Sequence, residues 1–152
     1  MNSKTCHTVF ALLGLVLFTA GCGGSESSST MPPGPLPEYK IIDLAPGAGA
    51  SPHAGDRITV NYTGWLYDQS KPDNKGKQFD TSIGREPFTF TLRAGQVISG
   101  WDMGFDNMKL GGTRRLIIPP HLGYGAEGTP GGPIPPNAAL VFEMQLLDIK
   151  PK

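Results

Sequence analysis

The chain has 152 residues, the size of one folded domain with a tail, and its 21 glycines and 15 prolines favour turns and short strands over long helices. Thirteen basic and thirteen acidic residues cancel, so there is no charge excess that would attract nucleic acid. Both cysteines, Cys6 and Cys22, lie near the start, which excludes a disulfide framework or a cysteine-based metal site in the rest of the chain.

Residues 1–22 are predicted to be an export signal. Val9–Ala20 is an unbroken run of apolar and small residues, long enough for a signal-peptide core of roughly 7–15 residues and too short for a membrane-spanning helix of roughly 20. Two small residues then precede Cys22, which resembles the lipobox of bacterial lipoproteins, whose cysteine is acylated. Two interpretations stay open, a lipid-anchored protein or a plain secretory signal, because Thr19 stands where a lipobox usually has leucine.

Residues 23–37 are predicted to be a disordered Gly/Ser/Pro linker, because they hold too little apolar surface to offset the entropy of ordering. Gly23 replaces the aspartate typical of lipoproteins kept in the inner membrane, which favours the outer membrane if Cys22 is acylated. Without acylation the protein would be soluble in the periplasm. The folded domain is expected over residues 38–152.

The first half of this domain is predicted to be mostly strand. From Asp56 to Tyr67, residues such as Ile58 and Val60 alternate with polar ones, which is the period of a half-buried strand. The other elements expected before residue 93 are an edge strand at 39–44, a loop at 46–55, a polar loop at 68–77, and short strands at 78–81 and 88–92.

One amphipathic helix is predicted over Gly100–Leu110. Trp101, Phe105 and Met108 share one face of it, and two glycines follow its end. Strands are expected to follow at 113–118 and 140–149. One helix against a bent antiparallel sheet makes an α+β domain, in which a concave apolar surface is left for a ligand.

Patterns for covalent or metal chemistry are missing from the sequence. His53 and His121 lie in proline-rich loops without neighbouring metal ligands, and no serine-nucleophile motif is present. Gly123–Gly128 matches GxGxxG, but the flanking prolines prevent a helix from starting there to bind a phosphate. We therefore expect no hydrolysis, redox chemistry or group transfer, and neither a metal nor a cofactor.

Seven short segments, most of them with an aromatic residue, follow one another in a specific order: VNYTG at 60–64, FDTS at 79–82, PFTF at 87–90, QVISGW at 96–101, YG at 124–125, IPPNA at 134–138 and LVF at 140–142. In this order the sequence resembles the FKBP-type peptidyl-prolyl cis–trans isomerases, over about residues 38–151. The resemblance implies an FKBP-like fold, a bent antiparallel sheet wrapped on one short helix. It also implies an enzyme that accelerates X-Pro bond rotation in unfolded or partly folded polypeptides, and inhibition by macrolides.

The resemblance further implies an aromatic pocket with Trp101 as its floor, at the start of the helix. Asp80 would be the one charged group at the rim, with Arg85 as its partner. The backbone N–H of Ile98 and the hydroxyl of Tyr124 would donate to substrate carbonyls. The implied walls are Tyr62, Phe79, Phe88, Val97, Ile98, Ile134 and Phe142. One departure from many family members is Thr129, which stands where they have a histidine.

Alternative roles remain open for three of these residues. Asp80 could be a turn carboxylate, the Tyr124 hydroxyl could bond within its own loop, and Trp101 could be a core residue. The domain could also be a non-catalytic binding module of the same fold that holds unfolded chains or a partner. The intact aromatic set favours the enzyme, as does the loop at 68–77, which is too short to hold an added chaperone domain.

Overall fold

The computed structural model describes residues 35–152; the predicted signal, Cys22 and most of the predicted linker lie outside the described residues. One sheet of six antiparallel strands has the order β1-β5-β6-β2-β3, and β4 pairs with β2 beside this path. The strands are β1 Lys40–Ala45, β2 Arg57–Tyr67, β3 Lys75–Thr81, β4 Phe88–Thr91, β5 Thr113–Ile118 and β6 Leu140–Lys150. The helix α1 spans Ser99–Gly104, and short 3-10 turns lie at η1 Pro72–Asn74 and η2 Pro120–Leu122.

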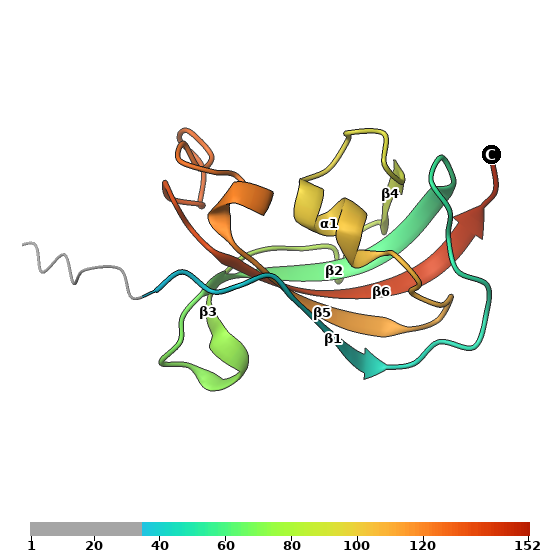
Figure 1. The fold of residues 1–152 in the computed structure, drawn as a ribbon, viewed down its shortest axis with the longest axis horizontal. Helices are drawn as coiled ribbons and strands as arrows, with labels where there is room; N and C mark the ends of the chain where they lie inside the picture. The colour runs from blue at the N-terminus through green and yellow to red at the C-terminus, as the bar shows by residue number, and fades with distance from the viewer. Residues whose placement is uncertain (1–34) are drawn as a thin grey trace, which may run out of the picture. The chain divides into compact units, whose positions relative to one another are not determined.

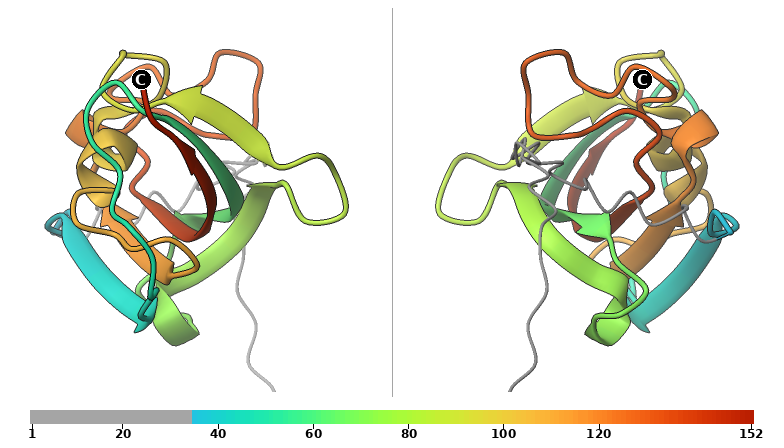
Figure 2. Two further views of the ribbon diagram at one scale, coloured as in Figure 1. Left: turned by 90° about the vertical axis from the view of Figure 1, so that its right-hand side faces the viewer. Right: turned by 90° about the vertical axis from the view of Figure 1, so that its left-hand side faces the viewer.

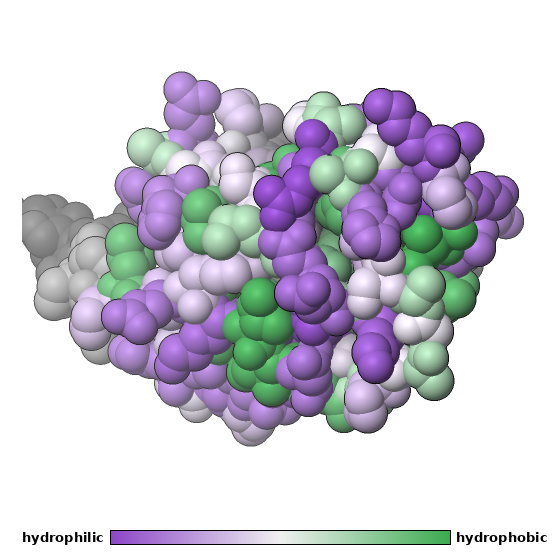
Figure 3. All heavy atoms as spheres, turned by 45° about the vertical axis from the view of Figure 1, so that its right-hand side comes forward, coloured by the Kyte–Doolittle hydropathy of each residue, from purple (hydrophilic) through white to green (hydrophobic). Residues whose placement is uncertain are grey.

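The sheet bends around α1, which lies on the concave side of β2, β5 and β6 (Figures 1 and 2). The predicted α+β fold is therefore confirmed. The predicted alternation of apolar and polar residues along the strands is confirmed as well. The inward residues of these three strands are buried: Ile58, Val60, Leu116, Ile118, Leu140, Phe142, Met144 and Leu146. On the face seen in Figure 3, apolar side chains form small separate patches among polar ones. Within residues 35–152, no helix is long and apolar enough to cross a membrane.

The helix is shorter than predicted, because α1 ends at Gly104 and not at Leu110. The guanidinium of Arg114 donates to the carbonyls of Gly104 and Asp106, which a longer helix would use for its own hydrogen bonds. Asn107 then takes a left-handed conformation with φ of 57°, which asparagine tolerates. Phe105 and Met108 are nevertheless buried as predicted, because the turn after the helix still directs them onto the sheet.

Two glycines allow α1 to lie directly against β5. A Cβ atom on Gly100 would lie 2.6 Å from the Ile118 side chain, and one on Gly104 would overlap Leu116. Since Trp101 lies between these glycines, their close approach brings its indole deep into the concave side of the sheet.

The loop predicted at 68–77 is also shorter, because β3 begins at Lys75 and not at Gln78. Lys75 pairs with Tyr67 of β2, and its ammonium lies 4.6 Å from the centre of the Trp65 ring. The same ammonium forms an ion pair of 2.6 Å with Glu143 of β6. These contacts extend the strand pairing into a segment whose composition resembles a loop.

Candidate functional site

A hollow of about 150 Å³ opens on the concave side of the sheet beside α1. Its residues come from β2, β3, β4, the start of α1, the loop after β5, and β6: Tyr62, Phe79, Asp80, Phe88, Gln96, Val97, Ile98, Trp101, Tyr124 and Phe142. Nine of the eleven predicted site residues are among them, and Gln96 was missed. The volume is below the roughly 300–1,000 Å³ of pockets for drug-sized ligands, so the hollow suits one residue-sized group.

Trp101 lies at the centre of the aromatic cluster and is only 5% exposed. The ring centre of Tyr62 is 5.1 Å from its indole and that of Phe142 is 5.2 Å away, both edge to face. Edge-to-face pairs add about 0.5–1.5 kcal/mol each beyond area burial. The indole N–H is buried without a hydrogen-bond acceptor among the described residues.

Strand β4 contributes two phenylalanines with different positions. Phe90, opposite Ile58 of β2, is 3% exposed and belongs to the core. Phe88, opposite Val60, is 39% exposed and lines the hollow, as predicted. Both rings lie on the same side of the strand with centres 5.6 Å apart, and both contact Trp101. The aromatic packing therefore continues from the core to the mouth of the hollow.

Among the described residues that line the hollow, Asp80 is the only charged one. One carboxylate oxygen accepts from the Tyr62 hydroxyl at 2.5 Å, and the other accepts from Arg85 at 2.5 Å and from the backbone N–H of Thr81 at 2.8 Å. Partial burial acts to raise the pKa of Asp80, but the hydrogen bonds from Tyr62, Arg85 and Thr81 outweigh it and leave the pKa below its ordinary value. Burial, with the neighbouring carboxylate, raises the pKa of Tyr62 to about 12.

Tyr124 also lines the hollow and is 40% exposed. Its hydroxyl has no hydrogen bond to the rest of the described chain, and burial, followed by the charge of Asp80, raises its pKa. The backbone N–H of Ile98 likewise has no acceptor within residues 35–152. The hollow thus includes a hydroxyl and a backbone amide that have no acceptor in the described chain, in a lining of mostly aromatic side chains.

Two predicted site residues, the rim partner Arg85 and the wall residue Ile134, do not line the hollow. Arg85 is mostly exposed and reaches the site only through its ion pair with Asp80. Ile134 is buried in the core, where its backbone forms hydrogen bonds with Thr129: the Thr129 N–H donates to the Ile134 carbonyl at 2.9 Å, and the Ile134 N–H donates to the Thr129 hydroxyl at 3.1 Å. Thr129, noted in the sequence as a departure, therefore closes the loop beside Tyr124.

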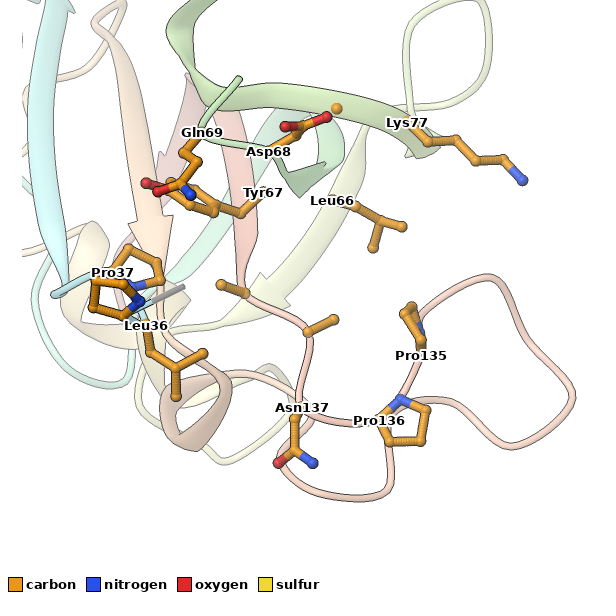
Figure 4. Close-up of a pocket in the computed structure, with 14 residues that line it drawn as sticks. Leu36, Pro37, Leu66, Tyr67, Asp68, Gln69, Lys77, Pro135, Pro136 and Asn137 are labelled. Atoms are coloured by element: carbon orange, nitrogen blue, oxygen red, sulfur yellow. The ribbon is translucent and has the colours of Figure 1, made fainter. Parts of the chain in front are cut away.

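A larger hollow of about 560 Å³ lies elsewhere, between the β2–β3 connection and the loop before β6 (Figure 4). Pro35–Pro37, the last residues of the predicted linker, line one side of it, and Pro135 and Pro136 line another. Tyr67 is the one aromatic residue among those that line it. It thus lacks the converging aromatic rings of the smaller hollow. The described residues also contain no cluster of three His, Cys, Asp or Glu side chains that could hold a metal.

Comparison with known proteins identifies the family of the chain. Residues 49–147 match the family model described as FKBP-type peptidyl-prolyl cis-trans isomerase. The FK506-binding protein of Neisseria meningitidis serogroup B is 51% identical over 110 residues, covering 72% of this chain and 94% of the relative. FK506-binding protein 2B of Rhizopus delemar is 46% identical over 147 residues, which cover 95% of this chain. The chain spans 64% of the length of that relative.

Solved structures agree with these relatives. FkpA from Escherichia coli is 45% identical, with a TM-score of 0.64, and the match covers 74% of this chain and 48% of that one. A peptidyl-prolyl cis-trans isomerase from Pseudomonas syringae is 41% identical, with a TM-score of 0.61 and coverage of 74% and 76%. By its sequence match, its bent sheet around one short helix and its aromatic hollow, this chain belongs to the FKBP-type peptidyl-prolyl cis–trans isomerases.

Proposed function

We propose that residues 38–152 accelerate the cis–trans rotation of X-Pro bonds in exported proteins, with the aromatic hollow as the active site. The observation that carries this proposal is the convergence of Trp101, Tyr62 and Phe142, whose ring centres lie 5.1–6.3 Å apart around one apolar floor. A proline ring on this floor would place its preceding carbonyl among the free donors and Asp80.

The reaction itself explains why such a site needs no nucleophile or metal. Rotation about a peptide bond faces a barrier of about 18–20 kcal/mol, because the C–N bond has partial double-bond character. This resonance also separates charge between oxygen and nitrogen, and water stabilises that planar, polar form. Twisting removes the resonance, so a dry aromatic pocket disfavours the planar amide relative to the twisted one. Contacts that fit only the twisted amide lower the barrier further.

We assign roles within the site from its geometry and the family resemblance. Trp101 is the floor on which the proline ring packs. The Ile98 N–H and the Tyr124 hydroxyl donate to substrate carbonyls, a role supported by their lack of partners within the described chain. Asp80 orients Tyr62 and adds negative potential near the twisting amide. The residues proposed to contact substrate around these are Tyr62, Phe79, Phe88, Val97 and Phe142, with Arg85 acting through Asp80 and Ile134 supporting the wall from the core.

The proposed partners are proline-containing polypeptides that are unfolded or partly folded. Macrolides of the FK506 type are proposed as inhibitors, since several relatives are named FK506-binding proteins. The sequence features at residues 1–22 support export, and Cys22 supports attachment to the periplasmic side of a membrane, with the outer membrane favoured. Stable anchoring would require more than one acyl chain at that cysteine. Acyl labelling of the full chain against a Cys22→Ser control tests this part separately.

The enzyme is tested with the purified domain in a protease-coupled prolyl-peptide assay. We expect acceleration that rises linearly with protein concentration and is abolished by an FK506-type macrolide. A folded domain that leaves the uncatalysed rate unchanged would contradict the enzyme and favour the binding module of the same fold. That second function predicts capture of an unfolded, proline-containing chain without any change in isomerisation rate.

A further inference from the structure

The position of the pocket floor depends on a very short helix. Helix α1 carries Trp101, and its N-cap residue, Ile98, lines the same hollow. With six residues and no side-chain cap at its start, the helix has little intrinsic stability of its own. Contacts from neighbouring segments must therefore fix its position.

The last turn of α1 is fixed from β5 and β1. Arg114 of β5 is 6% exposed, and its guanidinium donates to the Gly104 carbonyl at 2.7 Å and to the Asp106 carbonyl at 2.9 Å. The same guanidinium donates to Asp43 of β1 at 2.6 Å. These bonds satisfy carbonyls that the end of a helix leaves free.

The first turn of α1 is fixed differently, by one hydroxyl from a residue 61 positions earlier in the chain. Tyr39 directly precedes β1, its half-buried ring packs against the core, and its hydroxyl donates to the Gly100 carbonyl at 2.8 Å. Burial raises the pKa of Tyr39 to about 12, so the group remains a donor at neutral pH. No other side chain within residues 35–152 donates a hydrogen bond to the backbone of this turn; Asp102 there only accepts one from the Arg93 backbone.

We propose that Tyr39 is a positioning residue of the isomerase site, which fixes the Gly100 carbonyl and thereby the Trp101 ring and the Ile98 N–H. Gly100 lies directly before Trp101 and two residues after Ile98, so a displacement of its peptide moves both groups. Gly100 has no side chain of its own to anchor this turn. A larger residue could not take its place, because a Cβ atom there would lie 2.6 Å from Ile118. The activity readout of this inference rests on the proposed function.

Tyr39→Phe tests the role, because it removes the hydroxyl and keeps the ring that packs on the core. In a Trp65→Phe background Trp101 is the one remaining tryptophan of the chain, so its fluorescence reports the pocket floor. We expect kcat/KM to fall about fivefold, which corresponds to one hydrogen bond of about 1 kcal/mol. The Trp101 emission maximum should shift while the protein remains folded. Tyr67→Phe is the matched control: Tyr67 lines the larger hollow, so both readouts should stay unchanged.

Two results would overturn the role of Tyr39. One is a Tyr39→Phe protein with the parent's kcat/KM and Trp101 emission. The other is a loss of activity that disappears at a temperature where both proteins are fully folded, which would show a purely structural effect. If the parent protein has no isomerase activity, the proposed function fails, and the emission of Trp101 still decides whether Tyr39 positions the floor.

Discussion

Replacing Trp101, the proposed pocket floor, distinguishes a ring that contacts substrate from a ring that only packs in the core. Trp101→Leu keeps an apolar side chain but removes the edge-to-face contacts with Tyr62 and Phe142, at 5.1 and 5.2 Å. At about 0.5–1.5 kcal/mol for each of these two closest pairs, the variant should lose at least about 1–3 kcal/mol of unfolding free energy. Phe105→Leu is the matched control, because Phe105 is fully buried, contacts Trp101 and Phe90, and does not line the hollow.

Both variants should lose comparable stability, but only Trp101→Leu should lose activity. If the indole contributes at least about 1.4 kcal/mol to the twisted state, kcat/KM falls at least tenfold. Phe105→Leu should stay within about threefold of the parent, as its ring makes no substrate contact. Urea unfolding gives the stabilities, and the protease-coupled assay at a temperature where all proteins are folded gives the rates. Equal losses of kcat/KM in the two variants would refute the floor role and leave Trp101 as a core residue.

Three further predictions concern the rim, the free hydroxyl and the helix contact. The pKa of Asp80 is lowered in the folded state, so the ionised carboxylate stabilises the fold above its unfolded pKa, and this stabilisation is lost as the pH falls through the lowered folded value. The difference in unfolding free energy between the parent and Asp80→Asn, measured in urea, should therefore shrink from pH 7 to pH 2. A difference that stays constant would contradict the ion pair. Tyr124→Phe should lower kcat/KM about fivefold and leave the melting temperature unchanged, because the hydroxyl has no partner in the described chain; a large fall in melting temperature would show a structural bond instead. Gly104→Ala should lower the unfolding free energy measured in urea by about 1–3 kcal/mol, because its Cβ would overlap Leu116. In Gly123→Ala the new Cβ would meet only ordinary contacts at 3.4 Å, so the loss should be smaller. Equal losses would argue against close packing of α1 on β5.

The strands and the core could be predicted from the sequence, because the alternation of apolar and polar residues indicates which side of a strand is buried. The alternation from Ile58 onward predicted the inward face of β2, and that of Leu140–Leu146 predicted the inward face of β6. Val141 is an exception, because it is fully buried on the outer face, opposite Trp65 and Ile117 in the neighbouring strands. Alternation alone does not show that the outer face also contains a small buried cluster.

The site could be predicted only as a set of residue types in a family-like order. Nine of the eleven residues line one hollow, but the sequence does not show that Asp80 bonds Tyr62 through one oxygen and Arg85 through the other. Gln96 was missed because a polar residue next to Val97 gives no signal by itself, although its side chain accepts from the Thr91 N–H. Such contacts join different strands and loops, and no local pattern encodes them.

By itself the sequence determined the alternating strands and the aromatic set, because each of these depends on neighbouring residues or on residue type. Only the tertiary structure decided where the helix ends, how Thr129 closes its loop, and that Tyr39 reaches Gly100. These features depend on hydrogen bonds between segments far apart in the chain. Their partners meet only after the sheet has bent around α1, so the folded arrangement and not the local pattern selects them.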